Sequence, residues 1–258
     1  MLFSNREVER YARHLMLKEI GGPGQQRLKA SRILMVGVGG LGAPAALYLA
    51  AAGAGHLVLA DPDRVELSNL QRQVIFTEAD VGQPKVAAAA AHLAQLNPDI
   101  EVTALEAAVT KANAGALVAQ ADLVLDGSDN FATRFLVNEA CVRAGRTLVT
   151  GAAARWSGRV GVFSGRPCFR CLVSGDPDDA DGCAAVGVIG ALDGVIGSMM
   201  ALEAIKLVTR AGQPMTDRLL VYEGLTATTY QTSVSADPDC PVCSRAAVAL
   251  AGQAQAPP

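Results

Sequence analysis

Short apolar runs alternate with longer Ala-rich segments between residues 32 and 151 of the chain. The short runs read RILMV, HLVLA, EVTAL, DLVLD and TLVTG, and they have the length and composition of buried strands. The longer segments, such as PKVAAAAAHLAQLN at 84–97, have the length of helices. Strands that alternate with helices in this way predict a parallel sheet with helices on both faces, which is an α/β fold.

The pattern differs on either side of this region. Residues 5–18 combine charges with apolar residues at helical spacing, which predicts a short amphipathic helix, and the Gly-Gly-Pro-Gly run at 21–24 is predicted to break it. After Gly151, the runs RVGVF, LLVYEG and TATTYQTSV predict antiparallel strands that flank one long helix at 193–210. We expect these strands to extend the parallel sheet or to pack on it.

The composition excludes several classes of protein. The 258 residues carry 22 Lys and Arg against 25 Asp and Glu, so the formal charge of −3 provides no basic field for nucleic acid. Charges in the opening MLFSNREVERYARHL argue against an export signal. The most apolar stretch, 195–208, contains Glu203 and Lys206 and is too short to span a bilayer. We predict a cytoplasmic protein that binds neither nucleic acid nor membranes.

A glycine-rich turn follows the first strand and opens a helix. Residues 37–42 read GVGGLG, and Gly37, Gly39 and Gly40 allow backbone N–H groups to approach a phosphate at the helix N-terminus. The next strand ends in Asp61, 21 residues after Gly40, where a carboxylate can accept hydrogen bonds from ribose hydroxyls. These features predict a Rossmann-like nucleotide site, and by themselves they favour a nicotinamide-dependent oxidoreductase.

Residues beyond Asp61 shift this interpretation towards ATP. Four polar residues follow the second strand: Asn69, Gln71, Arg72 and Gln73. An arginine at this edge of the sheet suits a triphosphate better than a nicotinamide. Lys85 lies in the first turn of the next helix, where a cation opposes the helix dipole unless an anion binds there. The alternative is that Lys85 is an exposed, solubilising residue.

The run DGSDN at 126–130 follows the fourth strand and brings further carboxylates to the same edge. Asp126 and Asp129 are suited to holding a hydrated Mg²⁺ against phosphates. The alternative is that Asp129 or Asn130 caps the helix that follows. The ATP hypothesis therefore depends on the convergence of five residues: Gly40, Asp61, Arg72, Lys85 and Asp129.

Two pairs of cysteines suggest a metal site. Cys168 and Cys171 form one C-x₂-C pair and Cys240 and Cys243 form another, which supplies enough thiolates for one tetrahedral, structural Zn²⁺. Their separation permits this site without requiring it. Unrelated free thiols or a redox pair are the alternative.

The remaining cysteines and the polar segments carry weaker predictions. The acidic run SGDPDDADG at 174–182 predicts a mobile loop, and the Ala-, Gln- and Pro-rich tail at 246–258 is predicted to be disordered. Cys183 follows the acidic run and is either a small inert residue or an exposed thiol that accepts an acyl group or a disulfide partner. Cys141 is predicted to lie in the core.

Several strings together show that the chain resembles the MoeB/ThiF family of adenylyltransferases, which are relatives of ubiquitin-activating enzymes. They are RYAR at 10–13, GVGGLG, DPD at 61–63, LSNLQRQ at 67–73, VGQPK at 81–85, DGSDN, GAAARWSG at 151–158 and the paired C-x₂-C. The resemblance extends to about residue 245. It implies that the C-terminal glycine carboxylate of a small ubiquitin-like carrier protein attacks the α-phosphorus of MgATP, giving an acyl-adenylate and pyrophosphate.

The resemblance also implies a role for each matching residue: Asp61 for the ribose, Lys85 for the α-phosphate, Arg72 for the outer phosphates, Asp129 for Mg²⁺, and Gly40 and Asn69 for lining the site. Arg13, in RYAR, matches an arginine that completes the site of the neighbouring subunit in relatives, which implies a homodimer. Such chemistry needs positioning and charge stabilisation more than a protein nucleophile.

Within the family, GAAARWSG and the lack of an appended sulfur-transfer domain resemble the bacterial MoeB group, whose carrier is the small subunit of molybdopterin synthase. ThiF-like enzymes, which serve thiamine synthesis and use a cysteine at the position of Cys183, are the alternative. A sulfurtransferase or a cysteine desulfurase is a further candidate partner. The chain departs from the family pattern at 185–187, which read AVG in place of EAG, and at Asp193, where relatives usually carry an apolar residue.

We therefore predict one adenylation domain at 1–245. It comprises an N-terminal helical arm at 1–30, a nucleotide-binding half at 31–150 and a carrier-binding and zinc half at 151–245. A nicotinamide-dependent oxidoreductase and a non-catalytic carrier-binding scaffold are the competing hypotheses. Intact Arg72, Lys85 and Asp129 argue against the scaffold.

Overall fold

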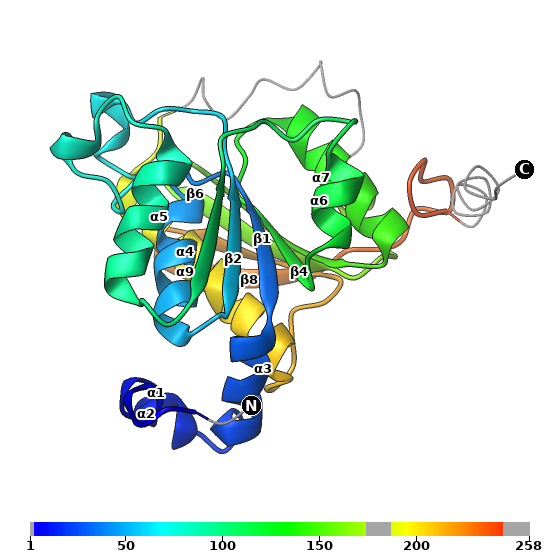
Figure 1. Ribbon diagram of the computed structural model, residues 1–258. Coiled ribbons are helices and arrows are strands. Elements are labelled where there is room, and N and C mark those ends of the chain that lie inside the picture. Colours follow the sequence, from blue (N-terminus) through cyan, green and yellow to red (C-terminus); the bar gives the residue numbers. More distant parts are fainter. Residues whose placement is uncertain (1–2, 174–186, 245–258) are drawn as a thin grey trace, which may run out of the picture.

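The computed structural model describes residues 3–173 and 187–244. Over these residues, eight strands form one sheet in the order β3-β2-β1-β4-β5-β6-β7-β8 (Figure 1). The predicted acidic loop at 174–182, Cys183 and the predicted tail at 246–258 lie outside the described residues. None of the helices in the described part of the chain is both long and apolar enough to cross a membrane.

Five strands form the parallel half of the sheet: β1 (Arg32–Val36), β2 (His56–Ala60), β3 (Glu101–Leu105), β4 (Leu123–Asp126) and β5 (Thr147–Ala154). The order runs outwards from β1 to β2 and β3 on one side and to β4 and β5 on the other. The connections after β1 and β4 therefore diverge, which opens a crevice at the carboxyl ends of these two neighbouring strands. The predicted α/β, Rossmann-like fold is confirmed.

Three antiparallel strands continue the same sheet: β6 (Ser157–Phe163), β7 (Arg218–Glu223) and β8 (Thr228–Ser233). Of the two predicted arrangements, extension of the first sheet is therefore correct. A tight turn at Arg155 and Trp156 joins β5 to β6, because Ala154 pairs directly with Ser157. Every residue of the edge strand β8 is exposed.

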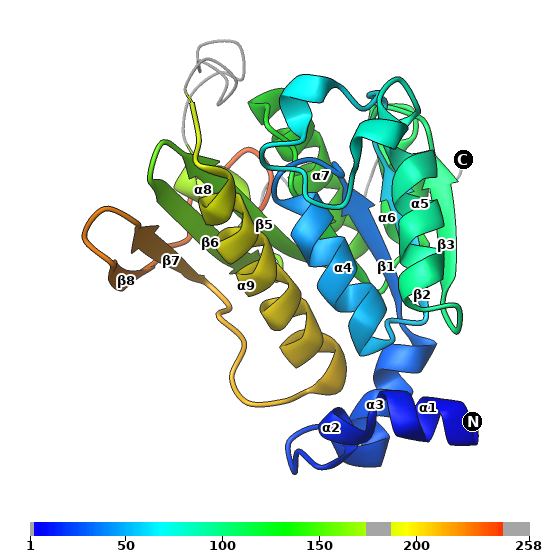
Figure 2. The ribbon, with the colours of Figure 1, turned by 90° about the vertical axis from the view of Figure 1, so that its left-hand side faces the viewer.

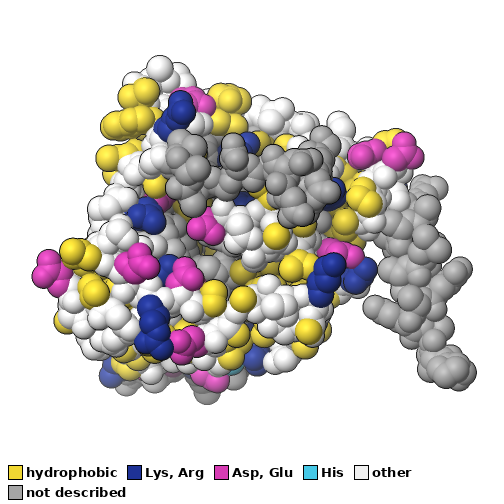
Figure 3. Space-filling view, turned by 90° about the horizontal axis from the view of Figure 1, so that it is seen from above, with side chains coloured by type: hydrophobic (Ala, Val, Ile, Leu, Met, Phe, Trp, Pro, Cys, Tyr) yellow, Lys and Arg dark blue, Asp and Glu magenta, His cyan; other side chains and the backbone are white. Residues whose placement is uncertain are grey.

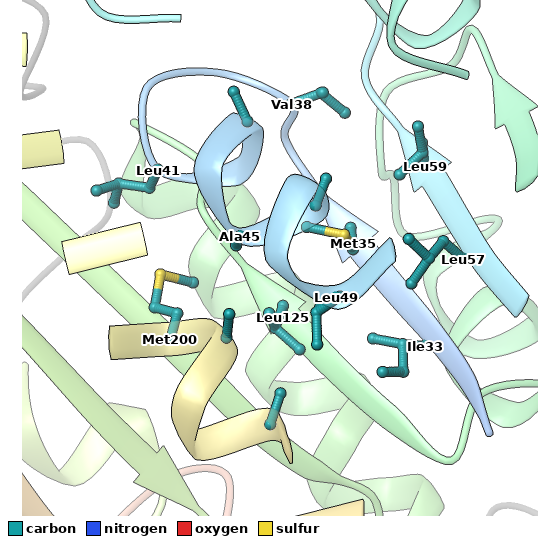
Figure 4. Packing of buried hydrophobic residues seen from close by; sticks show 14 of the residues in the cluster. Ile33, Met35, Val38, Leu41, Ala45, Leu49, Leu57, Leu59, Leu125 and Met200 are labelled. Carbon is teal, nitrogen blue, oxygen red and sulfur yellow. The ribbon is translucent and has the colours of Figure 1, made fainter. Parts of the chain in front are cut away.

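Helices cover both faces of the sheet (Figure 2). One face carries α4 (Gly42–Ala52), α5 (Lys85–Leu96) and α9 (Gly190–Thr209), whereas the other carries α6 (Ala114–Ala119), α7 (Phe131–Ala144) and α8 (Phe169–Leu172). In the first layer, Ala45 and Leu49 of α4 lie over Met35 of β1, and Met200 of α9 lies alongside them (Figure 4). Two short 3₁₀ turns, η1 (Leu67–Asn69) and η2 (Glu78–Asp80), lie between β2 and α5.

The N-terminal arm differs from the prediction. Two short helices, α1 (Asn5–Arg10) and α2 (Ala12–Leu15), replace the single helix expected at 5–18. Tyr11 separates them because its ring is buried against Gly53 and its hydroxyl accepts a hydrogen bond from Asn97 Nδ2 at 2.9 Å. The Gly-Gly-Pro-Gly run, expected to break the helix, instead begins α3 (Gly21–Ala30). Pro23 is tolerated there since the first turn leaves backbone N–H groups without helical partners.

Candidate active site

A cavity of about 660 Å³ lies in the crevice at the carboxyl ends of the parallel strands. Figure 3 looks onto this end of the molecule, where acidic and basic side chains are interspersed. The residues predicted from sequence to bind the nucleotide all line this cavity: Gly37, Gly39, Gly40, Asp61, Asn69, Gln71, Arg72, Gln73, Lys85, Asp129 and Asn130. They come from five separate segments of the chain, which the sheet topology brings to one edge.

The glycine-rich loop and Asp61 form one hydrogen-bonded unit. A Cβ atom on Gly42 would lie 2.0 Å from Gly37 O, so this turn requires glycine. Asp61 is 5% exposed, and its two carboxylate oxygens accept bonds from Val38 N at 2.7 Å and Asp63 N at 2.9 Å. Burial raises the pKa of the Asp61 carboxyl, although these N–H groups and Lys85 act to lower it. Asp61 is thus oriented before any ligand binds.

Lys85 begins α5 and lines the cavity. Its side chain is 7% exposed, and Nζ lies 2.8 Å from Asp63 Oδ2. The Lys85 backbone N–H also donates to Asp63 O at 2.9 Å. The alternative of an exposed, solubilising lysine is therefore wrong. Asp63 is 63% exposed, so this pairing leaves its carboxylate hydrated and the ammonium within reach of an anion in the cavity.

Residues 67–73 fold into a compact turn around η1. Asn69 Oδ1 accepts a bond from Glu66 N at 3.1 Å, which fixes the start of the turn. Arg72 Nη1 donates to Ser68 O at 3.1 Å, leaving other guanidinium N–H groups available to the cavity. Gln73 is 3% exposed, and its Oε1 atom has no hydrogen-bond partner among the described residues. The turn thus brings one guanidinium, that of Arg72, and amide side chains to the cavity.

The loop after β4 shows which of its polar residues caps α7. Asn130 caps α7, since its Oδ1 accepts from Thr133 N at 2.9 Å. Asp126 is fully buried, and its Oδ1 accepts from Ser128 N at 2.9 Å. Within the described part of the chain, the Asp129 carboxylate receives only a long contact of 3.4 Å from Asn130 Nδ2. Its exposed carboxylate at the cavity edge is an oxygen donor of the kind that Mg²⁺ prefers.

Arg134 is a residue of this site that sequence reasoning missed. It lies on α7, is 5% exposed and lines the cavity. Its guanidinium donates to Ser128 O, to Gly151 O at 2.8 Å and to Thr150 Oγ1 at 3.1 Å. Arg134 therefore ties the loop that carries Asp129 to β5. In the sequence, the residue resembles any other polar position of an amphipathic helix.

Asp193 was noted in the sequence as a departure but not as a site residue. It lies in the first turn of α9, is 4% exposed and lines the same cavity. A Cβ atom on Gly40 would lie 2.2 Å from its Oδ2 atom. Burial raises the pKa of the Asp193 carboxyl to about 6, against the opposing effect of Arg72.

Arg13 lies elsewhere. It is an exposed residue of α2 and does not line the cavity of its own chain. This placement is compatible with the predicted contribution to a neighbouring subunit and does not test it.

The four paired cysteines form a separate cluster. Their Sγ atoms all lie within 4.8 Å of one another, with 3.7 Å between Cys168 and Cys240 and 3.4 Å between Cys171 and Cys243. These separations exceed a disulfide bond and approach the ~3.8 Å edge of a tetrahedron of thiolates around Zn²⁺. Asn138 Nδ2 donates to Cys168 Sγ at 3.5 Å. The cluster is thus able to hold a metal ion and joins 168–171 to 240–243. Cys141 is buried in the core, as predicted.

The comparisons with known proteins identify the family. The model of the ThiF family matches residues 11–242. This chain belongs to the ThiF family. The predicted membership in the MoeB/ThiF family is therefore confirmed.

Several relatives of this ThiF-family chain are adenylyltransferases by name. It is 43% identical to a sulfur carrier protein adenylyltransferase of Thermus thermophilus, covering 94% of this chain and 93% of the relative. It is 43% identical to the molybdopterin-synthase adenylyltransferase of Escherichia coli, covering 94% and 98%. The sulfur carrier protein ThiS adenylyltransferase of E. coli is 42% identical, covering 93% and 96%.

A solved structure supports the fold of this ThiF-family chain. The crystal structure of E. coli MccB superposes with a TM-score of 0.80 at 22% identity, covering 92% of this chain and 72% of that chain. This likeness concerns the fold alone.

Proposed function

We propose that the protein transfers AMP from ATP to the C-terminal glycine carboxylate of a small ubiquitin-like sulfur carrier protein. The observation that carries this proposal is the convergence of Arg72, Lys85 and Asp129 with Asp61 around one cavity beside a glycine turn. Two cations and a carboxylate around one cavity suit a triphosphate with its Mg²⁺, whereas a nicotinamide ring carries no phosphate for these groups to bind. Together with the ThiF family assignment, this favours adenylyl transfer over the oxidoreductase hypothesis.

Each residue has a role that follows from its surroundings. Asp61 is held by two backbone N–H groups and keeps lone pairs for ribose hydroxyls. Lys85 exchanges its contact with Asp63 for the α-phosphate, and Arg72 neutralises the outer phosphates. The Asp129 carboxylate fits the oxygen-rich shell of Mg²⁺, which supplies charge neutralisation for the triphosphate when bound.

The reaction requires no protein nucleophile. A carboxylate oxygen of the carrier forms a bond to the α-phosphorus, and the bond from this phosphorus to the bridging oxygen of pyrophosphate breaks. The products are the acyl-adenylate and pyrophosphate. Lys85 and Arg72 stabilise the charge that develops on the phosphate oxygens, while the rigid attachment of the glycine loop to Asp61 keeps the nucleotide in position.

The small subunit of molybdopterin synthase is the carrier that we propose first, because GAAARWSG resembles the MoeB group. This segment forms the end of β5 and the turn to β6, where Arg155 and Trp156 are exposed beside the cavity-lining residue Ala153. The thiamine sulfur carrier is the second candidate, since the two E. coli adenylyltransferases are 43% and 42% identical to this chain. We expect the reaction to take place in the cytoplasm.

Pyrophosphate exchange tests the activity and the choice of carrier together. Labelled pyrophosphate should enter ATP when the chain is mixed with MgATP and a carrier that ends in Gly-Gly. The same carrier without its last glycine should give no exchange. Faster exchange with the molybdopterin carrier than with the thiamine carrier would support the first candidate. Failure of every Gly-Gly carrier with folded protein would contradict the proposal.

We further propose a homodimer in which Arg13 of one subunit completes the site of the other. Arg13 is exposed and lies outside the cavity of its own chain, as this arrangement requires. The variants Arg13→Ala and Lys85→Met should each be inactive alone. After the two are mixed under conditions that exchange subunits, up to about one quarter of all sites should regain both groups. No recovery of exchange activity in the mixture would contradict the arrangement.

We propose that the four-cysteine cluster holds one structural Zn²⁺. The support is the tetrahedron-like spacing of the four sulfurs and the bond from Asn138 that orients Cys168. Zn²⁺ would replace the thiol protons and hold 168–171 against 240–243. Elemental analysis of protein purified without chelators should find one Zn²⁺ per chain.

A further inference from the structure

Asp193 is a buried acid to which the reaction described above assigns no role. It is 4% exposed and belongs to α9, on which it is the acidic residue of the first turn. No hydrogen bond or ion pair within residues 3–173 and 187–244 engages its carboxyl group. A buried carboxyl without a hydrogen-bond partner is costly in its ionised form, so its position calls for an explanation.

The carboxyl group lies against the part of the site that should receive phosphate. A Cβ atom on Gly40 would lie 2.2 Å from Asp193 Oδ2 and 2.8 Å from Cγ, so the group touches the glycine turn. That turn opens α4, whose N-terminal N–H groups attract anions. Asp193 also lines the cavity itself. A phosphate bound beside Gly40 must therefore meet the Asp193 carboxyl group.

The groups around Asp193 offer limited compensation for a negative charge. The glycine turn at 37–42 and strand β5 contain no titratable side chain. The segment that packs on the start of α9 contributes Arg72, whose Cα lies 3.0 Å from a Cβ built on Gly190. Arg72 favours the ionised carboxyl, but burial outweighs it and raises the pKa of Asp193 to about 6. Lys85, Asp61 and Asp129 line the same cavity.

We propose that Asp193 is a nucleotide-binding residue that engages ATP in its protonated form, donating its carboxyl hydrogen to a phosphate oxygen beside Gly40. An ionised Asp193 would repel the same phosphate, and nucleotide binding would withdraw Arg72 from it. The proton is taken up from solvent as ATP binds. This inference rests on the proposed location of ATP in this cavity.

The sign of the pH effect follows from linkage. If only the protonated form binds well, the affinity for ATP is highest below pH 6 and falls as the pH rises through the value of about 6 for the free enzyme. The protonated fraction decreases by about 50-fold between pH 6 and pH 8, which sets the largest expected loss of affinity. Asp193→Asn keeps the shape and the hydrogen-bond donor but cannot ionise.

Calorimetric titration of MgATP into wild type and Asp193→Asn at pH 6 and pH 8 tests the proposal. Wild type should lose affinity by up to about 50-fold over this range, whereas Asp193→Asn should lose only what the titration of MgATP itself accounts for. At pH 8, Asp193→Asn should bind more tightly than wild type. The matched control is Asp217→Asn, which changes another acid whose pKa is raised by burial and which does not line the cavity.

A second measurement compares the enthalpy of MgATP binding to wild type and to Asp193→Asn. The binding enthalpy at pH 7 should vary with the ionisation enthalpy of the buffer, which reports proton uptake, and the variation should shrink in Asp193→Asn. Equal pH dependence in the two proteins would overturn the inference. So would weaker binding of Asp193→Asn at both pH values, which would mean that the ionised form is the useful one. In both cases, loss of ATP binding in Lys85→Met would leave the proposed site standing. If ATP binds equally well to Lys85→Met and wild type, the proposed site fails as well.

Discussion

The cavity in the parallel half of the sheet and the cysteine cluster in the C-terminal half both assemble residues that are distant in sequence. In the cavity, the polar groups remain apart, around a space of about 660 Å³. In the cluster, four sulfur atoms lie within 4.8 Å of one another. The first arrangement leaves room for a ligand of many atoms, whereas the second leaves room for a single ion.

The two regions also differ in the interactions that hold their side chains in place. Asp61, Asn69 and Asn130 are each fixed by backbone N–H groups that are close to them in sequence or lie in the glycine turn after β1. The cysteines are held together across 72 residues, which is the separation of Cys168 from Cys240. The positions of the cavity residues therefore follow from the sheet and its loops. The four cysteines, in contrast, come together only when segments 168–171 and 240–243 pack against each other. The difference teaches that loss of a cavity residue should affect chemistry, and loss of a cysteine should affect stability.

The largest effect is expected for Lys85→Met. Removing the ammonium from the cavity should lower pyrophosphate exchange by about 10²–10³-fold or more, as for other groups that stabilise developing charge. Stability should change little, because Asp63 is 63% exposed and remains hydrated without its partner. Exchange assays and thermal unfolding measure the two quantities.

The control for this variant is Lys18→Met, which removes a lysine that is 91% exposed and, among the described residues, forms an ion pair with Glu19 alone. It should leave exchange unchanged. A large loss of stability in Lys85→Met with little loss of exchange would contradict this prediction, because it would give Lys85 a structural role and not a catalytic one.

Cys240→Ser should produce the opposite result. Loss of one thiolate should abolish stoichiometric Zn²⁺ and lower stability by several kcal/mol, or about 10 °C in Tm for a chain of this size. Exchange per folded molecule should remain close to wild type at low temperature, since the cluster does not line the cavity. Calorimetry, metal analysis and exchange assays measure the three quantities.

Cys141→Ser is the matched control, because Cys141 is buried on α7 but lies outside the cluster. It should retain Zn²⁺ while losing some stability. Equal Zn²⁺ content in Cys240→Ser and wild type would show that the cluster is not the metal site.

The smallest effect is expected at Asn130, which caps α7 and also lines the cavity. Asn130→Ala removes the N-cap of α7 and should cost about 1 kcal/mol of stability. Asn130→Asp keeps a capping oxygen and should retain stability. If Asn130 only caps the helix, Asn130→Asp should also retain the dependence of exchange on Mg²⁺. A change in the Mg²⁺ concentration required by Asn130→Asp, with stability intact, would assign the amide to the metal site.

Sequence reasoning succeeded where a local pattern determines position. The apolar runs predicted the strands, and the ends of parallel strands necessarily meet at one edge, so the residues that follow β1, β2 and β4 line one cavity. Their chemical roles stay predictions. The arm was predicted less well: the tertiary contact of Tyr11 with Gly53 and Asn97 ends the first helix, and no local pattern announces it.

Asp193 and Arg134 show what the local pattern omits. Both belong to helices that have one face in the core. Only the folded chain reveals that one touches Gly40 and the other holds the loop of Asp129. A side chain's partner depends on distances across the sheet, which residue order along one helix does not contain.

By itself, the sequence determined the family, the α/β fold and the residue types that can bind a nucleotide or a metal, because periodicity and short motifs are local properties. The tertiary structure decided which of two arrangements the C-terminal strands adopt and that Lys85 is buried. It also decided that Asn130 rather than Asp129 caps α7, and which charges face Asp193. These outcomes depend on packing between segments far apart in the chain, where burial and mutual distance set the energy of each polar group.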